Sequence, residues 1–557
     1  MTDPSIRTPA RRPLKIFAFD PMYGRLARNR VSVDIPNETL LPGPRGSRVE
    51  VLDHDATNRR RYAPVDLDDP RILMQGGLDP TESHPWFHQQ MVYAVVMRVI
   101  ENFELALGRR WRFLKDNDRV PLTVHPHALQ ERNAYFDDEL HALLFGYFRA
   151  DDRDVGANLP GGTVFTCLSH DIVAHEATHA MVHTLRPRLL EPTNHDVLAF
   201  HEGFADLVAI LQHFTFRDVL EHQLADARGD LGATGPLLEL GGQFGFATGR
   251  GKARRSAIGD SDGKVAAYDP GLEPHALGRI LVEAVFDAFL QTYRARTADL
   301  VRIATGGSGV LPAGALHPDL VTRLADEAAR TAQNVLTMCI RAFEYLPPVD
   351  VTFGDFLRAL VTADSDAVPD DPLEQRNALI EGFRRRGIIP SGVSSLAVEA
   401  LRWPAFVGSL PPVIAPEEMA RLLHQQAIAF DAPESSDAKT PAQRQDDKTL
   451  GQALHAYARA HREALGLAAG LPIHVAGWHV SQGWTRDRRF VAQAVIQLVQ
   501  TVPATQVPER GGLPLRGGST IVTDASGSIR YLIAKPLQRV EAGPGARGSR
   551  PAAGAAR

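Results

Sequence analysis

Two histidines four residues apart constrain this chain more than any other feature of its sequence. His175 and His179 share one face if residues 171–182 are helical, because an α-helix brings positions i and i+4 to the same side. Apolar residues on both sides of the pair predict a largely buried helix, and buried imidazoles need polar partners. A metal ion shared by both rings would satisfy them. Glu176 would then lie beside the ion, placed to accept a proton from a water molecule bound there.

A second motif supplies the ligand that the first helix lacks. Glu202 and Asp206 are also four apart, on a strongly apolar stretch, and Gly203 beside the carboxylate should let the two helices approach closely. His195 and His201 remain open as alternative third ligands. A carboxylate followed four residues later by an aspartate better suits a ligand with a hydrogen-bond acceptor behind it. We therefore expect one zinc ion, held by the histidine pair and Glu202, with a fourth position open for water.

Three further motifs accompany the metal-binding pattern. Asn133-Ala134-Tyr135-Phe136 is followed by a second aromatic segment, Phe145-Gly146-Tyr147, and Glu273-Pro274-His275 begins a long apolar stretch typical of a helix. Arg255 lies in a loop rich in Gly, Arg and Lys. Together with the zinc motifs, these segments resemble the thermolysin-like gluzincin zinc peptidases over roughly residues 86–390.

The resemblance assigns expected roles to several residues. It implies that Asn133 and Ala134 belong to an edge strand that pairs with the substrate backbone, as strand addition does. It implies that His275 donates a hydrogen bond to the developing oxyanion and that Arg255 contacts the substrate carbonyl. Asp206 falls where the family has the aspartate that orients a zinc histidine.

The expected function follows from this site. A zinc-dependent peptidase would hydrolyse peptide bonds with a zinc-bound water, from which Glu176 takes a proton, so the expected partner is a peptide or protein substrate. The alternative is a non-proteolytic metal-binding scaffold that reuses the fold, with the C-terminal residues binding a protein partner. The intact Glu176 favours the enzyme, because a scaffold has no use for that base.

The sequence also departs from the family pattern. No tyrosine occurs between Ala180 and Phe200, where the family usually carries one that stabilises the tetrahedral intermediate. His275 would have to supply this stabilisation, with Arg255 or Tyr268 as further candidates. Of the family's calcium cluster the sequence retains Asp171, but His213 falls where a calcium carboxylate would be and the acidic run that follows in the family has no counterpart, so calcium is not predicted.

Composition restricts the class of protein. A chain of 557 residues implies roughly two to four domains. The net charge of -5 gives no reason to expect nucleic acid as a partner. The only cysteines, Cys167 and Cys339, exclude a disulfide framework and favour a reducing compartment, with Cys167 expected to be a small core residue. Neither a signal peptide nor a membrane-spanning run is recognisable, so a cytoplasmic location and no membrane partner are expected.

The expected fold class is α+β, arranged as a two-lobed gluzincin peptidase with a small C-terminal α+β module. The first lobe would be mixed α/β, with the edge strand and the zinc helix, and the second mostly helical. A segment from Ala432 to Lys448, rich in Pro, Ser, Asp and Gln, reads as a linker before a helix from Leu450 to Leu465. The expected divisions are a β-rich region 1–85, peptidase lobes 86–190 and 191–390, a helix and linker 391–448, a separable module 449–540 and a disordered tail 541–557.

Overall fold

Helices hold 45% and strands 19% of the protein, so the chain is mixed α and β, consistent with the expected α+β class. The structure, a computed structural model, describes residues 9–25, 29–111, 113–115, 118–153, 158–232, 237, 239–240, 255–256, 265–431, 441–485, 488–507 and 513–537. The expected tail, 541–557, lies outside these residues. Among the described helices, none is both long enough and apolar enough to cross a membrane.

A mixed sheet and the helix packed on it form the N-terminal part of the molecule. The sheet has the order β11-β10-β8-β3, in which β10 and β3 both run parallel to β8, and β9 and β11 pair antiparallel with β10. Helix α2 (Pro85–Leu107) is buried along most of its length. A hairpin of β1 and β2 packs on α2. The strand bounds are Arg11–Phe17 (β1), Arg30–Pro36 (β2), Val49–Val51 (β3), His54–Asp55 (β4), Arg60–Arg61 (β5), Phe113–Lys115 (β6), Asp118–Val120 (β7), Leu122–Leu129 (β8), Ala134–Asp137 (β9), Ala142–Arg149 (β10) and Thr163–Phe165 (β11).

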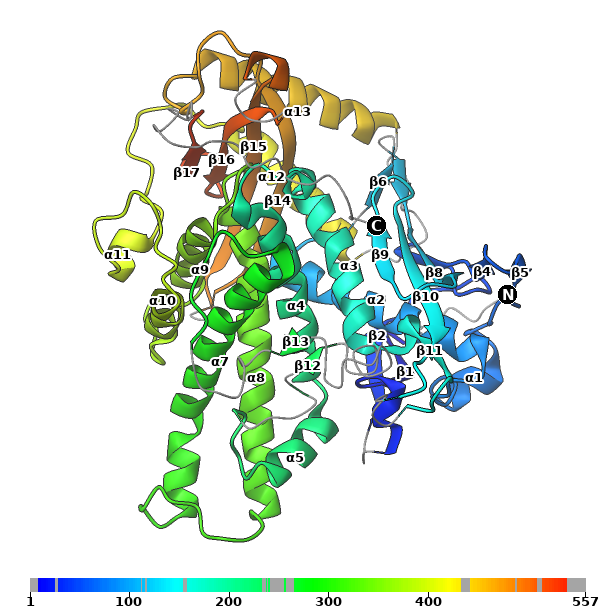
Figure 1. The fold of residues 1–557 in the computed structure, drawn as a ribbon. Helices are drawn as coiled ribbons and strands as arrows, with labels where there is room; N and C mark the ends of the chain where they lie inside the picture. Colours follow the sequence, from blue (N-terminus) through cyan, green and yellow to red (C-terminus); the bar gives the residue numbers. More distant parts are fainter. Residues whose placement is uncertain are drawn as a thin grey trace.

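The centre and the far side of the molecule are helical. Figure 1 shows α3 and α4 between the sheet and the helices α7 to α10. Most side chains on α3 and α4 are buried, including polar ones such as His175 and Asp206. The helix bounds are Pro70–Met74 (α1), His170–Leu185 (α3), His195–His213 (α4), Arg217–Asp226 (α5), Pro274–Ala304 (α7), Pro318–Ala342 (α8), Phe353–Ala367 (α9), Gln375–Arg385 (α10) and Val398–Leu401 (α11).

The close approach at Gly203 joins α4 to α7, not α4 to the histidine helix α3 as the sequence suggested. A Cβ atom on Gly203 would lie 2.7 Å from the carbonyl oxygen of Gly278, and one on Gly278 would lie 2.8 Å from the carbonyl oxygen of Ala199. Both obstacles are backbone atoms, which cannot rotate away as a side chain can. The glycine pair therefore sets how closely α7, which begins beside His275, packs on the helix that carries Glu202.

Replacing Gly203 with alanine should destabilise the protein by about 1–3 kcal/mol, because the added methyl group forces the two helix backbones apart. The matched control is Gly451→Ala on α13 (Pro441–Ala460), where an added Cβ meets nothing within 4 Å. There alanine should be neutral or stabilising by up to about 1 kcal/mol, since glycine is the poorer helix former. Urea denaturation of both variants measures the difference. If Gly203→Ala and Gly451→Ala had equal free energies of unfolding, α4 and α7 would be able to accommodate the added methyl group without strain.

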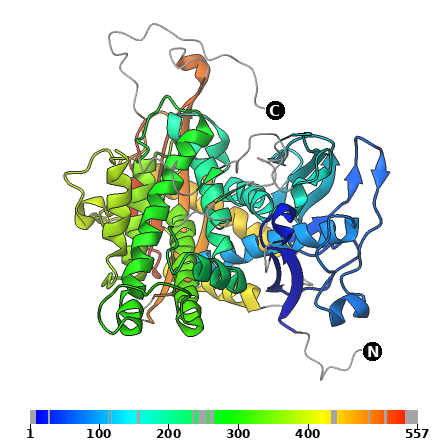
Figure 2. The same ribbon diagram turned by 60° about the horizontal axis from the view of Figure 1, so that its bottom comes forward.

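The C-terminal part is a four-stranded antiparallel sheet with the order β14-β15-β16-β17. Its bounds are His474–Trp484 (β14), Phe490–Val502 (β15), Leu515–Thr523 (β16) and Ile529–Lys535 (β17). The last two strands pair antiparallel and form a hairpin around Asp524. In Figures 1 and 2 this sheet lies beside the helices of the central body.

The expected linker from Ala432 to Lys448 is wrong in its second half. Helix α13 begins at Pro441, nine residues before the expected start at Leu450. Proline suits the first turn of a helix, and the Ala, Gln and Arg residues after it are good helix formers despite their polarity. Arg421 on α12 (Pro416–Asp431) pairs with Asp446 at 2.8 Å and holds the early turns in place. The first half of the expected linker lies outside the described residues.

Candidate metal centre

Helix α3 carries the histidine pair because its apolar residues bury it between the sheet and the other helices. Val173, Ala174 and Ala177 are fully buried. His175 and His179 are also nearly buried, with 6% and 9% of their surfaces exposed, so their rings cannot rely on bulk water for hydrogen bonds. Glu176, on the same helix, is similarly enclosed.

The structure brings the two histidines of α3 together with Glu202 of α4. The Nε2 atoms of His175 and His179 lie 2.9 Å apart. Glu202 places Oε2 at 3.3 Å from the first nitrogen and Oε1 at 3.8 Å from the second. Zinc bonds of about 2.0–2.2 Å in a tetrahedron separate ligand atoms by about 3.4 Å, and the three observed distances bracket that value. The donor set therefore fits a zinc ion.

Asp206, one helical turn after Glu202, fixes the orientation of the His175 ring. Its Oδ1 lies 2.8 Å from Nδ1 of His175. A carboxylate at Nδ1 keeps the ring proton on that nitrogen and leaves the Nε2 lone pair directed toward His179 and Glu202. The role expected for Asp206 from its spacing thus has the required geometry.

The two alternative third ligands are placed elsewhere. His195 is exposed at the first residue of α4. His201 is buried and stacks its ring on that of His179, with the centroids 4.5 Å apart and the planes 12° apart. Burial lowers the pKa of His201 to about 4, so the stacked ring is neutral. Within the described residues, the group of ligand atoms at this point consists of His175, His179 and Glu202.

His275 reaches the same carboxylate from the start of α7. Glu273 caps that helix by accepting hydrogen bonds from the backbone N–H groups of His275 and Ala276, and Pro274 occupies the first turn. The cap holds His275 Nδ1 at 3.0 Å from Glu202 Oε2, while 42% of the His275 side chain stays exposed. Burial raises the pKa of Glu202, but the imidazoles around it, His179 foremost, hold that pKa well below its usual range.

The expected edge strand lies next to the histidine helix. Ala134 is the first residue of β9, and the carbonyl oxygen of Asn133 accepts a hydrogen bond of 2.9 Å from Gly146 N. Among the described strands, β9 pairs only with β10, which leaves its other edge available to an extended peptide. The ring of Phe136 lies 5.6 Å from that of His183 on α3, so the strand runs along this helix.

Arg255 and Tyr268 were the further candidates for stabilising the oxyanion. Arg255 lies in the short strand β13 (Arg255–Ser256), which pairs with β12 (Glu239–Leu240), and its side chain lies outside the described part of the structure. The Tyr268 hydroxyl donates a 2.6 Å hydrogen bond to Asp196 in the first turn of α4. This hydroxyl therefore already has a partner within the fold.

The structure also gathers a second group of ligand-type side chains, His88, His127 and Cys167, which the sequence did not predict. These residues come from three separate segments, so no local spacing pattern could have revealed them. No protein-family model and no curated protein matches this chain.

Proposed function

We propose that the protein is a zinc-dependent peptidase with a two-lobed, gluzincin-type catalytic region. The observation that carries the proposal is the convergence of His175, His179 and Glu202, with Asp206 behind one ring and His275 at the open side. A zinc ion bound there would polarise the scissile carbonyl group and lower the pKa of a water molecule. A metal site with a purely structural role would need neither a base such as Glu176 beside the ligands nor a partly exposed histidine such as His275 at its rim.

The side chains around the ligands would divide the work of hydrolysis. Glu176 accepts the proton of the attacking water and later delivers it to the leaving nitrogen. His275 donates a hydrogen bond to the carbonyl oxygen as negative charge develops on it. The free edge of β9 hydrogen-bonds the substrate backbone and places the scissile bond along α3.

Replacing His275 with alanine should lower turnover by on the order of 10²–10³ while leaving peptide binding nearly unchanged, because an oxyanion donor acts mainly in the transition state. Separate measurement of kcat and KM checks this division. The control is His317→Ala, since His317 is an exposed residue that caps the start of α8 and should affect turnover little. An effect of His275→Ala on KM alone would make the residue a substrate-binding group instead.

Metal analysis and a peptide library test the proposal together. The purified protein should contain zinc and cleave members of a mixed peptide library, and His179→Ala should lose both the metal of this centre and the cleavage. The control is His183→Ala, one turn further along α3, which removes an imidazole from the same helix but no ligand. Zinc bound at this centre without cleavage of any peptide would favour the metal-binding scaffold.

A further inference from the structure

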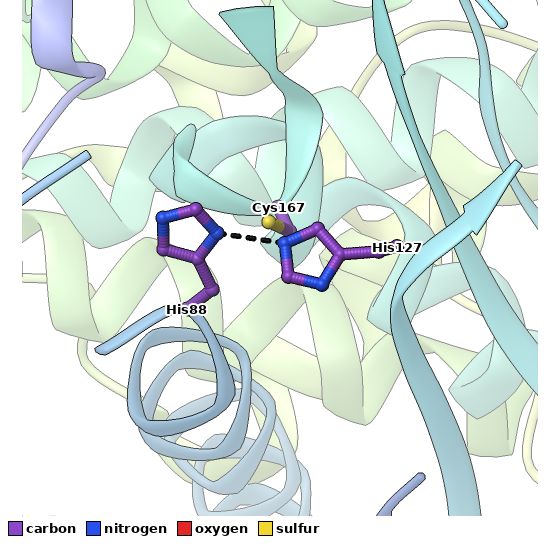
Figure 3. Close-up of side chains that lie close together, drawn as sticks. All are labelled: His88, His127 and Cys167. Atoms are coloured by element: carbon purple, nitrogen blue, oxygen red, sulfur yellow. Dashed lines mark hydrogen bonds between the residues drawn. The ribbon is translucent and has the colours of Figure 1, made fainter. Parts of the chain in front are cut away.

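Three buried side chains with metal-ligating atoms meet between α2, β8 and the turn that leads into α3. His88 comes from α2, His127 from β8 and Cys167 from the short 3-10 turn η2 (Thr166–Leu168). Figure 3 shows the two rings edge to edge, with the sulfur beside them. The exposed fractions are 1%, 2% and 0%, and the three ligand atoms lie within 4.8 Å of one another.

The outer nitrogen of each ring faces a hydrogen-bond acceptor. Nδ1 of His127 lies 2.7 Å from Oδ1 of Asp53, and Nε2 of His88 lies 3.0 Å from the carbonyl oxygen of Glu82. Neither acceptor can donate, so each outer nitrogen carries the hydrogen of its ring. Neutral rings in these tautomers turn two lone pairs toward each other across the 2.8 Å that separates His88 Nδ1 from His127 Nε2.

Two lone pairs at this distance require a cation between them. A proton would use the two nitrogens alone, whereas a metal ion would also use the nearby sulfur of Cys167. The pair repeats the arrangement at His175 and His179, where two inner nitrogens face each other and a carboxylate holds an outer one. Outer nitrogens that donate to a carboxylate or a backbone carbonyl are characteristic of histidine ligands.

We propose that His88, His127 and Cys167 bind a second zinc ion, independent of the proposed catalytic metal. Two imidazoles and a thiolate suit zinc and disfavour magnesium or calcium, which prefer oxygen ligands. The Cys167 thiolate and the nearby Asp53 carboxylate together balance the two positive charges of the ion. The thiol loses its proton on binding, so occupancy should release a proton to the solvent.

The proposed ion would cross-link three distant segments immediately before the histidine helix. Cys167 lies three residues before His170, where α3 begins, and η2 packs against both α2 and α3. Side chains that share an ion at fixed bond lengths hold their backbones in register, as a disulfide would. The second zinc would therefore fix the entry of α3 against the sheet and help to position the histidine pair further along this helix.

Cobalt binding distinguishes the second centre from the first, because only the second contains sulfur. In the full-length double variant His175→Ala/His179→Ala, added Co²⁺ should bind in a ratio of about one per chain and give an intense sulfur-to-cobalt charge-transfer band in the near ultraviolet. Cys167→Ala in this background should abolish the band. The matched control is Cys339→Ala, which removes the same atom from another fully buried cysteine and should leave the band unchanged.

X-ray absorption at the zinc edge of the double variant tests the same centre without a cysteine substitution, in case Cys167→Ala fails to fold. The spectrum should show one sulfur at about 2.3 Å and nitrogens at about 2.0–2.1 Å. A folded double variant that binds neither Co²⁺ nor zinc, or that binds metal without sulfur, would overturn the proposal and leave a proton shared by the two rings. Because this variant lacks His175 and His179, these results do not depend on the proposed peptidase activity.

Discussion

Replacing Glu176 with glutamine should lower peptide hydrolysis by at least about 10²–10⁴ while leaving the bound metal in place. Glutamine has nearly the same shape as glutamate, but its amide cannot take the proton of the attacking water. Glu176 is adjacent to His175 and is not a member of the proposed ligand group His175, His179 and Glu202, so metal content should not change. Turnover of a library-derived peptide and metal analysis of the same sample measure the two quantities.

The control for this variant is Glu381→Gln, which makes the same chemical change at an exposed carboxylate paired with Arg384 on α10. It should keep both activity and metal. If Glu176→Gln hydrolysed peptide as fast as the control, Glu176 would not be the general base. Loss of metal in Glu176→Gln would instead make Glu176 a ligand.

Local sequence patterns predicted the parts of the candidate site that depend on a single helix. The spacing of His175 and His179 requires only that α3 be helical, and the same holds for Glu202 and Asp206 on α4. The cap formed by Glu273 and Pro274 likewise marks the start of α7 by local chemistry alone. Each of these interactions joins residues only a few positions apart, so the local sequence is enough to predict it.

Contacts between distant segments could not be predicted in the same way. His88 and His127 are 39 residues apart and meet only because α2 packs on the sheet that contains β8. Cys167 follows after a similar interval, on a turn with no metal-binding spacing of its own, and the sequence suggested only a small core residue. The partner of Gly203 was misjudged for the same reason, since a glycine in a helix indicates a close approach without naming the neighbour.

The C-terminal sheet bears on the separable module that composition predicted. The sequence predicted a separable module, and its boundaries remain a prediction. Ile496 and Ile521 pack with residues of α12 and α13 in a hydrophobic cluster of their own. Val522, Tyr531 and Ile533, however, belong to the same hydrophobic core as the central helices, which argues against independent folding. Polar contacts reinforce this packing. The Tyr531 hydroxyl donates to Asp366 at 2.9 Å, and Thr520 Oγ1 donates to the carbonyl oxygen of Leu346 at 2.7 Å.

Deleting the chain after residue 448 should therefore leave a protein that no longer folds stably. Burying a large apolar side chain contributes about 1.5–3 kcal/mol, so Val522, Tyr531 and Ile533 together account for about 5–9 kcal/mol. This is comparable with the whole stability of a typical domain, about 5–15 kcal/mol. The deletion also uncovers the apolar side chains against which these residues pack, so the loss should exceed that sum.

Thermal unfolding and soluble yield of the truncated chain measure this effect, with a shorter deletion after residue 540 as the control. The control removes none of these contacts, which all involve residues up to Lys535, and should unfold like the full-length protein. Glu344 provides an independent check, because this buried carboxylate accepts hydrogen bonds from Gln493 and Ser481 of the sheet. Gln493→Ala removes one donor and should cost about 1.5–3 kcal/mol in the intact chain. If the chain ending at residue 448 unfolded cooperatively at the same temperature as the full-length protein, the result would support the prediction of a separable C-terminal module.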